Sequence, residues 1–181
     1  MIAQDIKTDI WNWIQNYIEV NHKFYDYKFP PCPYARAARL KGLLDIQVYE
    51  SGSAVEFIQT HTQDLATNKN FTVRVLAMPP RFRWYWNIRR WVERMNHTIV
   101  GDDLYAQHGL AIKTQSQYPG LFNQGPYFIV IINRLSDIMS GHEALLKTDY
   151  YKPWASHHYQ AVVKRRQQTI DNYNKGKHDN C

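Results

Sequence analysis

The stretch from residue 43 to residue 78 constrains the fold of this chain more than any other. "LLDIQVY" at 43–49 alternates apolar and polar residues, as a half-buried strand does, and "FTVRVLAM" at 71–78 is a second strand-like run. Between them, Ser53 and Glu56 have the spacing of a capping box, which predicts a helix start. Strand, helix and strand in this order form a parallel unit with a right-handed crossover. The chain therefore needs a sheet covered by helices.

Two later segments complete the predicted sheet. "GLAIKTQ" at 109–115 and "PYFIVIIN" at 126–133 both have the composition of strands. The second run is apolar on both faces, and this is typical of a strand at the centre of a sheet. We therefore predict an α+β fold with a mixed four-stranded sheet covered by helices.

Helical spacing of apolar residues predicts the covering layers. The opening segment has such a stripe from Ile6 to Ile18, and a second stripe runs from Trp84 to Met95. Two further helices are expected near the end of the chain, over 136–147 and from about Pro153 to Ile170. No linker or repeat divides these elements. We expect a single domain over 1–174, followed by a polar tail over 175–181.

Composition narrows the class of partner and the compartment. The chain has 22 Lys and Arg against 16 Asp and Glu, a formal net charge of +6, which favours anionic partners of any kind. Two cysteines argue against a disulfide scaffold and suit a reducing compartment. No apolar run reaches the ~20 residues of a membrane span, and the opening residues are unlike a signal peptide. We expect a cytoplasmic protein with no membrane partner.

Cys32 lies between prolines in "PPCPYARAARLKG" at 30–42. Pro33 at the first helical position would make Cys32 the N-cap of a short helix that Gly42 ends. The positive end of that helix and the nearby Arg36 and Arg39 would stabilise a thiolate. Three interpretations stay open: a buried capping residue, a thiol that lines a site, and a catalytic nucleophile.

Two further residues are candidates for binding. Arg134 follows the most apolar strand, where it is placed either to hold a carboxylate or phosphate or to pair with a local acid such as Asp137. The eight histidines lack the spacing of a metal site, but haem needs only one axial imidazole. His158 lies one turn from Trp154 and Val162 and is expected to point inward. It is either that ligand or a buried histidine bonded to the backbone.

The run "RFRWYWNIRRWVERMNH" at 81–97 supports a different class of function. Its apolar stripe belongs to the core, which leaves arginines and one tryptophan on the outer face. Together with the "KRR" cluster, this face suits a nucleic-acid-binding accessory protein, because rings stack on bases and cations contact phosphates. The residues of this alternative are Arg83, Trp86, Arg90, Lys164, Arg165 and Arg166. A protein-interaction module without chemistry is the third alternative.

In chain order, "FPPCPYARAARLKG", "RVLAMPP" and "GPYFIVIINR" resemble two bacterial groups: uncharacterised proteins with a Cys-Pro-[Phe/Tyr]-Ala segment and the YqcI/YcgG family. Some YqcI/YcgG-like proteins are haem-dependent oxygenases that hydroxylate nitrogen in small guanidino compounds. The resemblance implies a haem-dependent oxygenase that acts on a small guanidino-type molecule. Together with the candidate residues, it leads us to expect a small cytosolic enzyme, an oxidoreductase in this version, that acts on a polar small molecule, anionic or guanidino-type, through a pocket near Cys32.

In the haem-dependent version of this enzyme, Cys32 is the catalytic or pocket-lining thiol. Arg36 and Arg134 hold the substrate, and His158 ligates haem. A binding protein or thiol-dependent transferase would use the same residues without iron. The chain departs from the family at Asn133-Arg134, where those proteins tend to have His-Pro.

Overall fold

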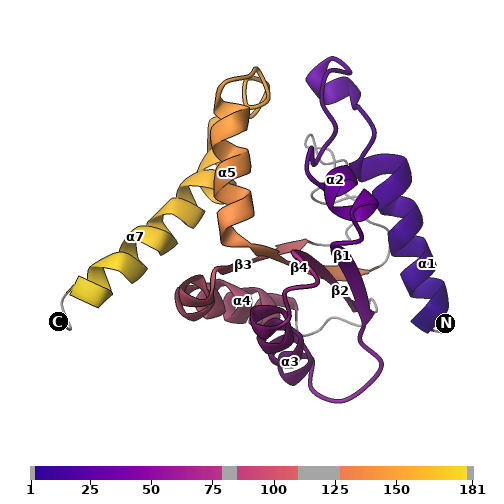
Figure 1. The fold of residues 1–181 in the computed structure, drawn as a ribbon, viewed down its shortest axis with the longest axis vertical. Coiled ribbons are helices and arrows are strands. Elements are labelled where there is room, and N and C mark those ends of the chain that lie inside the picture. The colour runs from indigo at the N-terminus through magenta and orange to yellow at the C-terminus, as the bar shows by residue number, and fades with distance from the viewer. Residues whose placement is uncertain (1–2, 79–84, 110–126, 179–181) are drawn as a thin grey trace.

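The structure, a computed structural model, describes residues 3–78, 85–109 and 127–178. These residues contain a mixed sheet with the strand order β1-β2-β4-β3 (Figure 1). β1 (Leu44–Val48) runs parallel to β2 (Val73–Met78), and β4 (Phe128–Arg134) runs antiparallel both to β2 and to β3 (Leu104–Gly109). The predicted α+β fold is confirmed, as is the central place of the most apolar strand.

Two helices cover one face of the sheet. They are α3 (Ala54–Thr67) and α4 (Tyr85–Ile99), and Figure 1 shows both below the strands. The predicted capping box is present, since the Glu56 N–H donates to the Ser53 hydroxyl at 3.3 Å. Side chains of every second strand residue meet these helices in the larger apolar core: Leu76, Met78, Leu104, Ala106, Phe128, Val130 and Ile132.

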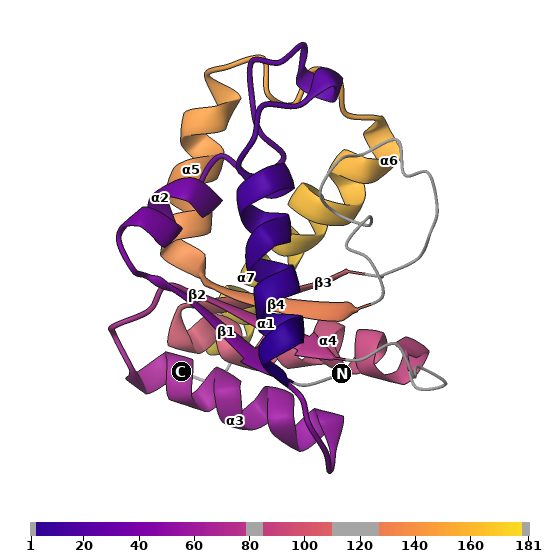
Figure 2. The same cartoon turned by 90° about the vertical axis from the view of Figure 1, so that its right-hand side faces the viewer.

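The other face is covered in two parts. α1 (Ala3–Trp13), extended by a π-helical turn over Ile14–Ile18, and the short α2 (Ala35–Leu40) pack on β1 and β2. α5 (Leu135–Leu146) packs on β3 and β4. α6 (Ser156–Tyr159), a π-helical turn over Gln160–Lys164 and α7 (Arg165–His178) follow it (Figure 2). The sheet therefore separates two layers of helices, except that α7 also contacts α4.

The third strand begins earlier than predicted. A 3-10 turn over Val100–Asp102 ends at Asp103, which has a left-handed φ of 59° and redirects the chain. Leu104 consequently starts β3, and of the strand predicted over 109–115 only Gly109 lies within the described residues.

Helix α7 continues to His178, so residues 175–178 of the predicted tail are helical. Within the described residues, no helix combines the length and apolar character needed to cross a membrane.

Candidate functional site

Cys32 lies in the extended segment that leads to α2. Its N–H donates to the Ile18 carbonyl at 3.2 Å, and its carbonyl accepts from the Ala35 N–H at 3.3 Å. The helix begins only at Ala35, with Tyr34 in the N-cap position, so the predicted capping role of Cys32 is wrong. Pro33 and Tyr34 form a turn before the helix instead.

The surroundings of Cys32 favour a neutral thiol. Burial raises the pKa of Cys32, and the N–H groups of Tyr34 and Ala35 only oppose that rise. The predicted stabilisation of a thiolate by Arg36 and Arg39 does not appear, because Arg36 is exposed and Arg39 donates to Glu19 at 2.8 Å. Cys32 therefore has the character of a lining residue rather than of an activated nucleophile.

An aromatic cluster of Tyr25, Tyr150 and Trp154 holds the Cys32 segment against the segment that precedes α6. The Tyr150 hydroxyl donates to the Pro31 carbonyl at 2.6 Å, and the Tyr150 ring stacks on Tyr25 with centroids 4.7 Å apart. The Trp154 indole N–H donates to the Tyr25 hydroxyl at 3.2 Å. These contacts place Cys32 beside the segment that leads into α6.

Tyr34 connects the Cys32 turn to α5. Its hydroxyl donates to the Gly141 carbonyl, and its ring lies so close to Gly141 that any Cβ there would overlap it. Burial raises the pKa of Tyr34, Tyr151 and Cys32 add to that rise, and Arg166 opposes it. Tyr34 therefore lies within electrostatic reach of both Cys32 and Arg166.

Arg166, on the first turn of α7, is the least usual residue of this region. It is only 5% exposed, and it has no hydrogen-bond or ion-pair partner among the described residues. Burial lowers the pKa of its guanidinium and four nearby phenols oppose this change, but an arginine stays charged in any case. We call these residues the tyrosine–arginine cluster: Tyr34, Tyr105, Tyr151, Tyr159 and Arg166.

His142 of α5 adjoins this cluster. Its Nδ1 lies 2.8 Å from the Tyr151 hydroxyl, within hydrogen-bond distance. Burial lowers the pKa of His142, and the charge of Arg166 lowers it further. Burial also raises the pKa of Tyr151 to about 12, against the effect of Arg166. The two groups are therefore a neutral imidazole and a neutral phenol, a pair that can exchange a proton with a bound molecule.

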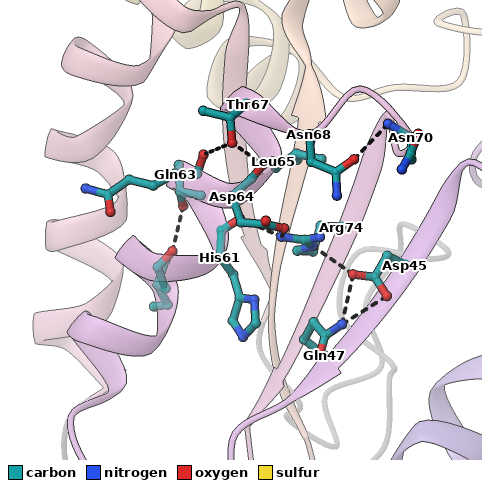
Figure 3. Close-up of polar contacts among 12 residues, drawn as sticks. Asp45, Gln47, His61, Gln63, Asp64, Leu65, Thr67, Asn68, Asn70 and Arg74 are labelled. Carbon is teal, nitrogen blue, oxygen red and sulfur yellow. Dashed lines mark hydrogen bonds and ion pairs between the residues drawn. The ribbon is translucent and has the colours of Figure 1, made fainter.

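The other two buried arginines differ from each other: Arg74 has acidic partners, whereas Arg134 has only carbonyl acceptors among the described residues, and its Nη1 is buried without a hydrogen-bond partner there. Arg74 donates to Asp45 at 2.8 Å, to Asp64 at 2.6 Å and to the His61 carbonyl, and Figure 3 shows these groups converging on it. Its charge is fully compensated, which identifies this group as a structural ion-pair network. No set of three His, Cys, Asp or Glu side chains in the described part of the chain could hold a metal ion.

Arg134 lies apart from Cys32. Its side chain points to the α3 side of the sheet and donates to the carbonyls of Leu65 at 2.5 Å and Asn68 at 3.0 Å. Cys32 and Arg36 belong to the opposite layer. The expectation that Arg134 shares one pocket with Cys32 is therefore wrong, because alternation along β4 sends this side chain through to the other face.

His158 is buried beside the aromatic cluster, as expected from its spacing. Its ring centroid lies 4.3 Å from that of Trp154. Burial lowers the pKa of His158 to about 4, so the imidazole is neutral near pH 7. It lies in the same layer as Cys32 and Arg166, and apart from Arg134.

The residues of the nucleic-acid alternative divide between surface and interior. Trp86 and Arg90 are exposed on α4, and Lys164 is exposed before α7. Arg165 is half exposed and donates to Glu93 at 2.8 Å. Arg166 is buried, so its predicted place on this surface is wrong. Arg83 lies outside the described residues.

Comparison of the chain with protein-family models, curated proteins and solved structures found no match. The candidate site therefore depends on its own geometry. Sequence patterns did not indicate this site because its tyrosines come from four separate segments of the chain. In addition, Arg166 resembles its exposed neighbours in sequence. The high tyrosine content, 13 residues, was the available signal.

Proposed function

We propose that this protein is a small cytoplasmic enzyme that binds a small anion, a carboxylate or a phosphate, at the tyrosine–arginine cluster. The observation that supports the proposal is the buried guanidinium of Arg166 without a counter-charge. Leaving one charge of a buried pair without its partner costs roughly 3–5 kcal/mol. Arg134 is also buried without an acid, but two carbonyls accept from its guanidinium. Arg166 has no such acceptor among the described residues, and we infer that a ligand supplies one.

Among the described residues, no Asp or Glu bonds to Arg166. Of the other residues, the segments 79–84 and 110–126 contain no Asp or Glu, and 179–181 contains Asp179. The phenols of Tyr105 and Tyr151 can donate hydrogen bonds, whereas the Tyr34 hydroxyl is already engaged with Gly141. None of the three phenols carries a negative charge while its pKa is raised. An anion from solution supplies both the charge and the acceptor oxygens that these groups need.

The arrangement also supports chemistry on that anion. The His142 and Tyr151 pair lies close enough to Arg166 to feel its charge, so a proton donor and acceptor stand beside the bound molecule. The thiol of Cys32 lies close enough to Tyr34 to raise the pKa of that phenol. In this proposal Arg166 binds, the phenols orient, and the His142–Tyr151 pair moves a proton.

The haem-dependent version of this enzyme relies on His158. A neutral imidazole is the form that ligates iron, and His158 has it. The residue is only 6% exposed and packs against Trp154, so a macrocycle could reach it only by displacing packed side chains. The described residues do not fit haem. A Soret band in protein supplied with haem, lost in His158→Ala, would reverse this conclusion.

The anion site is tested by thermal unfolding of purified protein with phosphate, sulfate, acetate and citrate in turn. An anion at about 100 times its Kd stabilises the fold by about 2.7 kcal/mol, which raises the Tm of a chain of this size by several degrees. Arg166→Met should abolish this rise. It should also raise the Tm without anion, because an apolar side chain removes the uncompensated charge.

Arg165→Met is the matched control, since this neighbouring side chain points to Glu93 and lies outside the cluster. It should keep the anion-dependent rise. The proposal fails if no anion in the panel stabilises the parent protein, or if Arg166→Met responds to anions as the parent does.

A further inference from the structure

The outer face of α4 carries one aromatic and three basic side chains in a single stripe. Trp86, Arg90, Arg94 and His97 follow one another at four, four and three residues, and all four are exposed. This spacing places them on one side of the helix. Members four residues apart are separated by about 6 Å along the helix axis, and members three residues apart by about 4.5 Å. The opposite side of α4 is buried in the core through Ile88, Val92 and Ile99, so its orientation is fixed.

The positive charge of this stripe is not neutralised by the helix itself. Glu93 is the acid of α4, and it is engaged by Arg89 at 3.1 Å and by Arg165 at 2.8 Å. Arg90 and Arg94 have no hydrogen-bond or ion-pair partner among the described residues. Two guanidinium groups one turn apart therefore face solvent with their charge uncompensated.

The surface beside the stripe is hollowed. A hollow of about 550 Å³ is lined by Asn87, Arg90, Glu93, Arg94 and His97. A second, of about 760 Å³, lies between α3 and α4, and Arg94 belongs to its lining too. The lining of the second hollow also includes polar residues, one aromatic residue and one acid: Gln59, Gln63, Thr98, Trp91 and Asp102. A flexible ligand could follow both hollows past Arg94.

We infer that this stripe, Trp86, Arg90, Arg94 and His97, binds single-stranded nucleic acid. The arginines contact successive phosphates, and a base stacks on Trp86, which is 63% exposed. The Arg89 guanidinium lies 5.6 Å from the centroid of the Trp86 ring and adds its charge to the stacking platform. A lipid surface is disfavoured because the apolar side of α4 is already buried, which leaves no apolar row to insert.

This surface is independent of the anion site. It lies on the α3–α4 side of the sheet, whereas Tyr34 and Tyr105 lie on the opposite side. The α7 helix, which carries Arg166, contacts α4, but that contact includes the Arg165–Glu93 ion pair and none of the stripe residues acts on the pKa of Arg166. Either proposal can fail without affecting the other.

The test is fluorescence anisotropy of labelled oligo(dT) and oligo(rU) titrated with the full chain at several salt concentrations. Binding should weaken as salt rises. In Arg90→Gln/Arg94→Gln the slope of log K against log salt should fall by about 1.4, the value for two lost phosphate contacts on a single strand. Trp86→Ala should weaken binding by roughly tenfold at a fixed salt concentration.

Lys41→Gln/Lys147→Gln is the control. It removes the same charge from exposed positions at the C-terminal ends of α2 and α5, and it should keep the parent slope. The inference is overturned if no oligonucleotide binds at low salt, or if both double variants change the slope equally. Binding to phosphatidylserine vesicles without binding to oligonucleotides would assign the stripe to a membrane surface and would overturn it too.

Discussion

Two adjacent arginines at the start of α7 have opposite surroundings. Arg165 is half exposed and paired with Glu93, whereas Arg166 is buried among phenols without an acid. In sequence they look alike, within a basic cluster typical of a surface. A helix turns ~100° per residue, so neighbours point in different directions and only packing decides which one enters the interior.

His158 provides a prediction at the same scale. Its pKa is about 4 in the folded protein and 6.5 as the reference for the unfolded chain. Between these values the unfolded chain binds the proton and the folded protein does not, so stability falls as the pH is lowered from 6.5 to 4. The full effect is about 3 kcal/mol. Urea unfolding at several pH values should show a shallower pH dependence for His158→Gln than for the parent protein.

Two half-buried histidines, His61 and His108, also have a lowered pKa, so the parent protein will lose stability in acid for several reasons. The comparison of variant with parent isolates His158. Parallel profiles for the two proteins would show that this imidazole takes up its proton equally readily in both states.

At the scale of the element, α5 and the turn before α2 depend on one small residue. Gly141 is buried in α5, and a methyl group there would overlap the Tyr34 ring. We expect Gly141→Ala to destabilise the parent protein although alanine favours a helix. In a Tyr34→Ala background the same change should stabilise by about 1 kcal/mol, the usual gain of alanine over glycine in a helix.

A double-mutant cycle of chemical unfolding measures this reversal of sign. The same effect of Gly141→Ala in both backgrounds would contradict the contact between Tyr34 and α5.

Elements with a strong local pattern could be predicted from the sequence. The alternation in β1, the capping box of α3 and the apolar run of β4 each specify their own structure. The start of β3 could not be predicted, because it depends on Asp103 adopting a left-handed conformation. Asp103 also accepts from the N–H and the hydroxyl of Ser136 at 2.8 and 2.7 Å, contacts 33 residues away along the chain.

The candidate site was harder to predict for the same reason. Cys32 draws attention in the sequence because prolines surround it, but its burial, which raises its pKa, comes from distant segments such as the one around Tyr150. Arg134 looked like a binding residue because it follows an apolar strand. Its carbonyl partners at Leu65 and Asn68 come from α3, and no local pattern indicates them.

For the whole molecule, the sheet is the layer that holds two separate surfaces together. β2 and β4 are hydrogen-bonded on both edges and buried on both faces, with Leu76, Ile129 and Val130 fully inaccessible. β1 and β3 are edge strands. Amides of the central pair can therefore exchange only when both helical layers and both neighbouring strands open, which amounts to global unfolding.

Native-state hydrogen exchange should follow this order. The amides of Val75–Met78 and of 129–132 should exchange slowest, with a free energy of opening equal to that of global unfolding by urea. The exposed end of α7, from Asp171 to Gly176, should exchange fastest among the described helices because few of its side chains are buried. The outer edge of β3 is already covered in part, because the Asn96 side chain of α4 donates to the Ala106 carbonyl and accepts from the Ala106 N–H. If β1 were as protected as β2 and β4, its outer edge would have to be covered too, and a second copy of the chain pairing along β1 would be the first explanation to test.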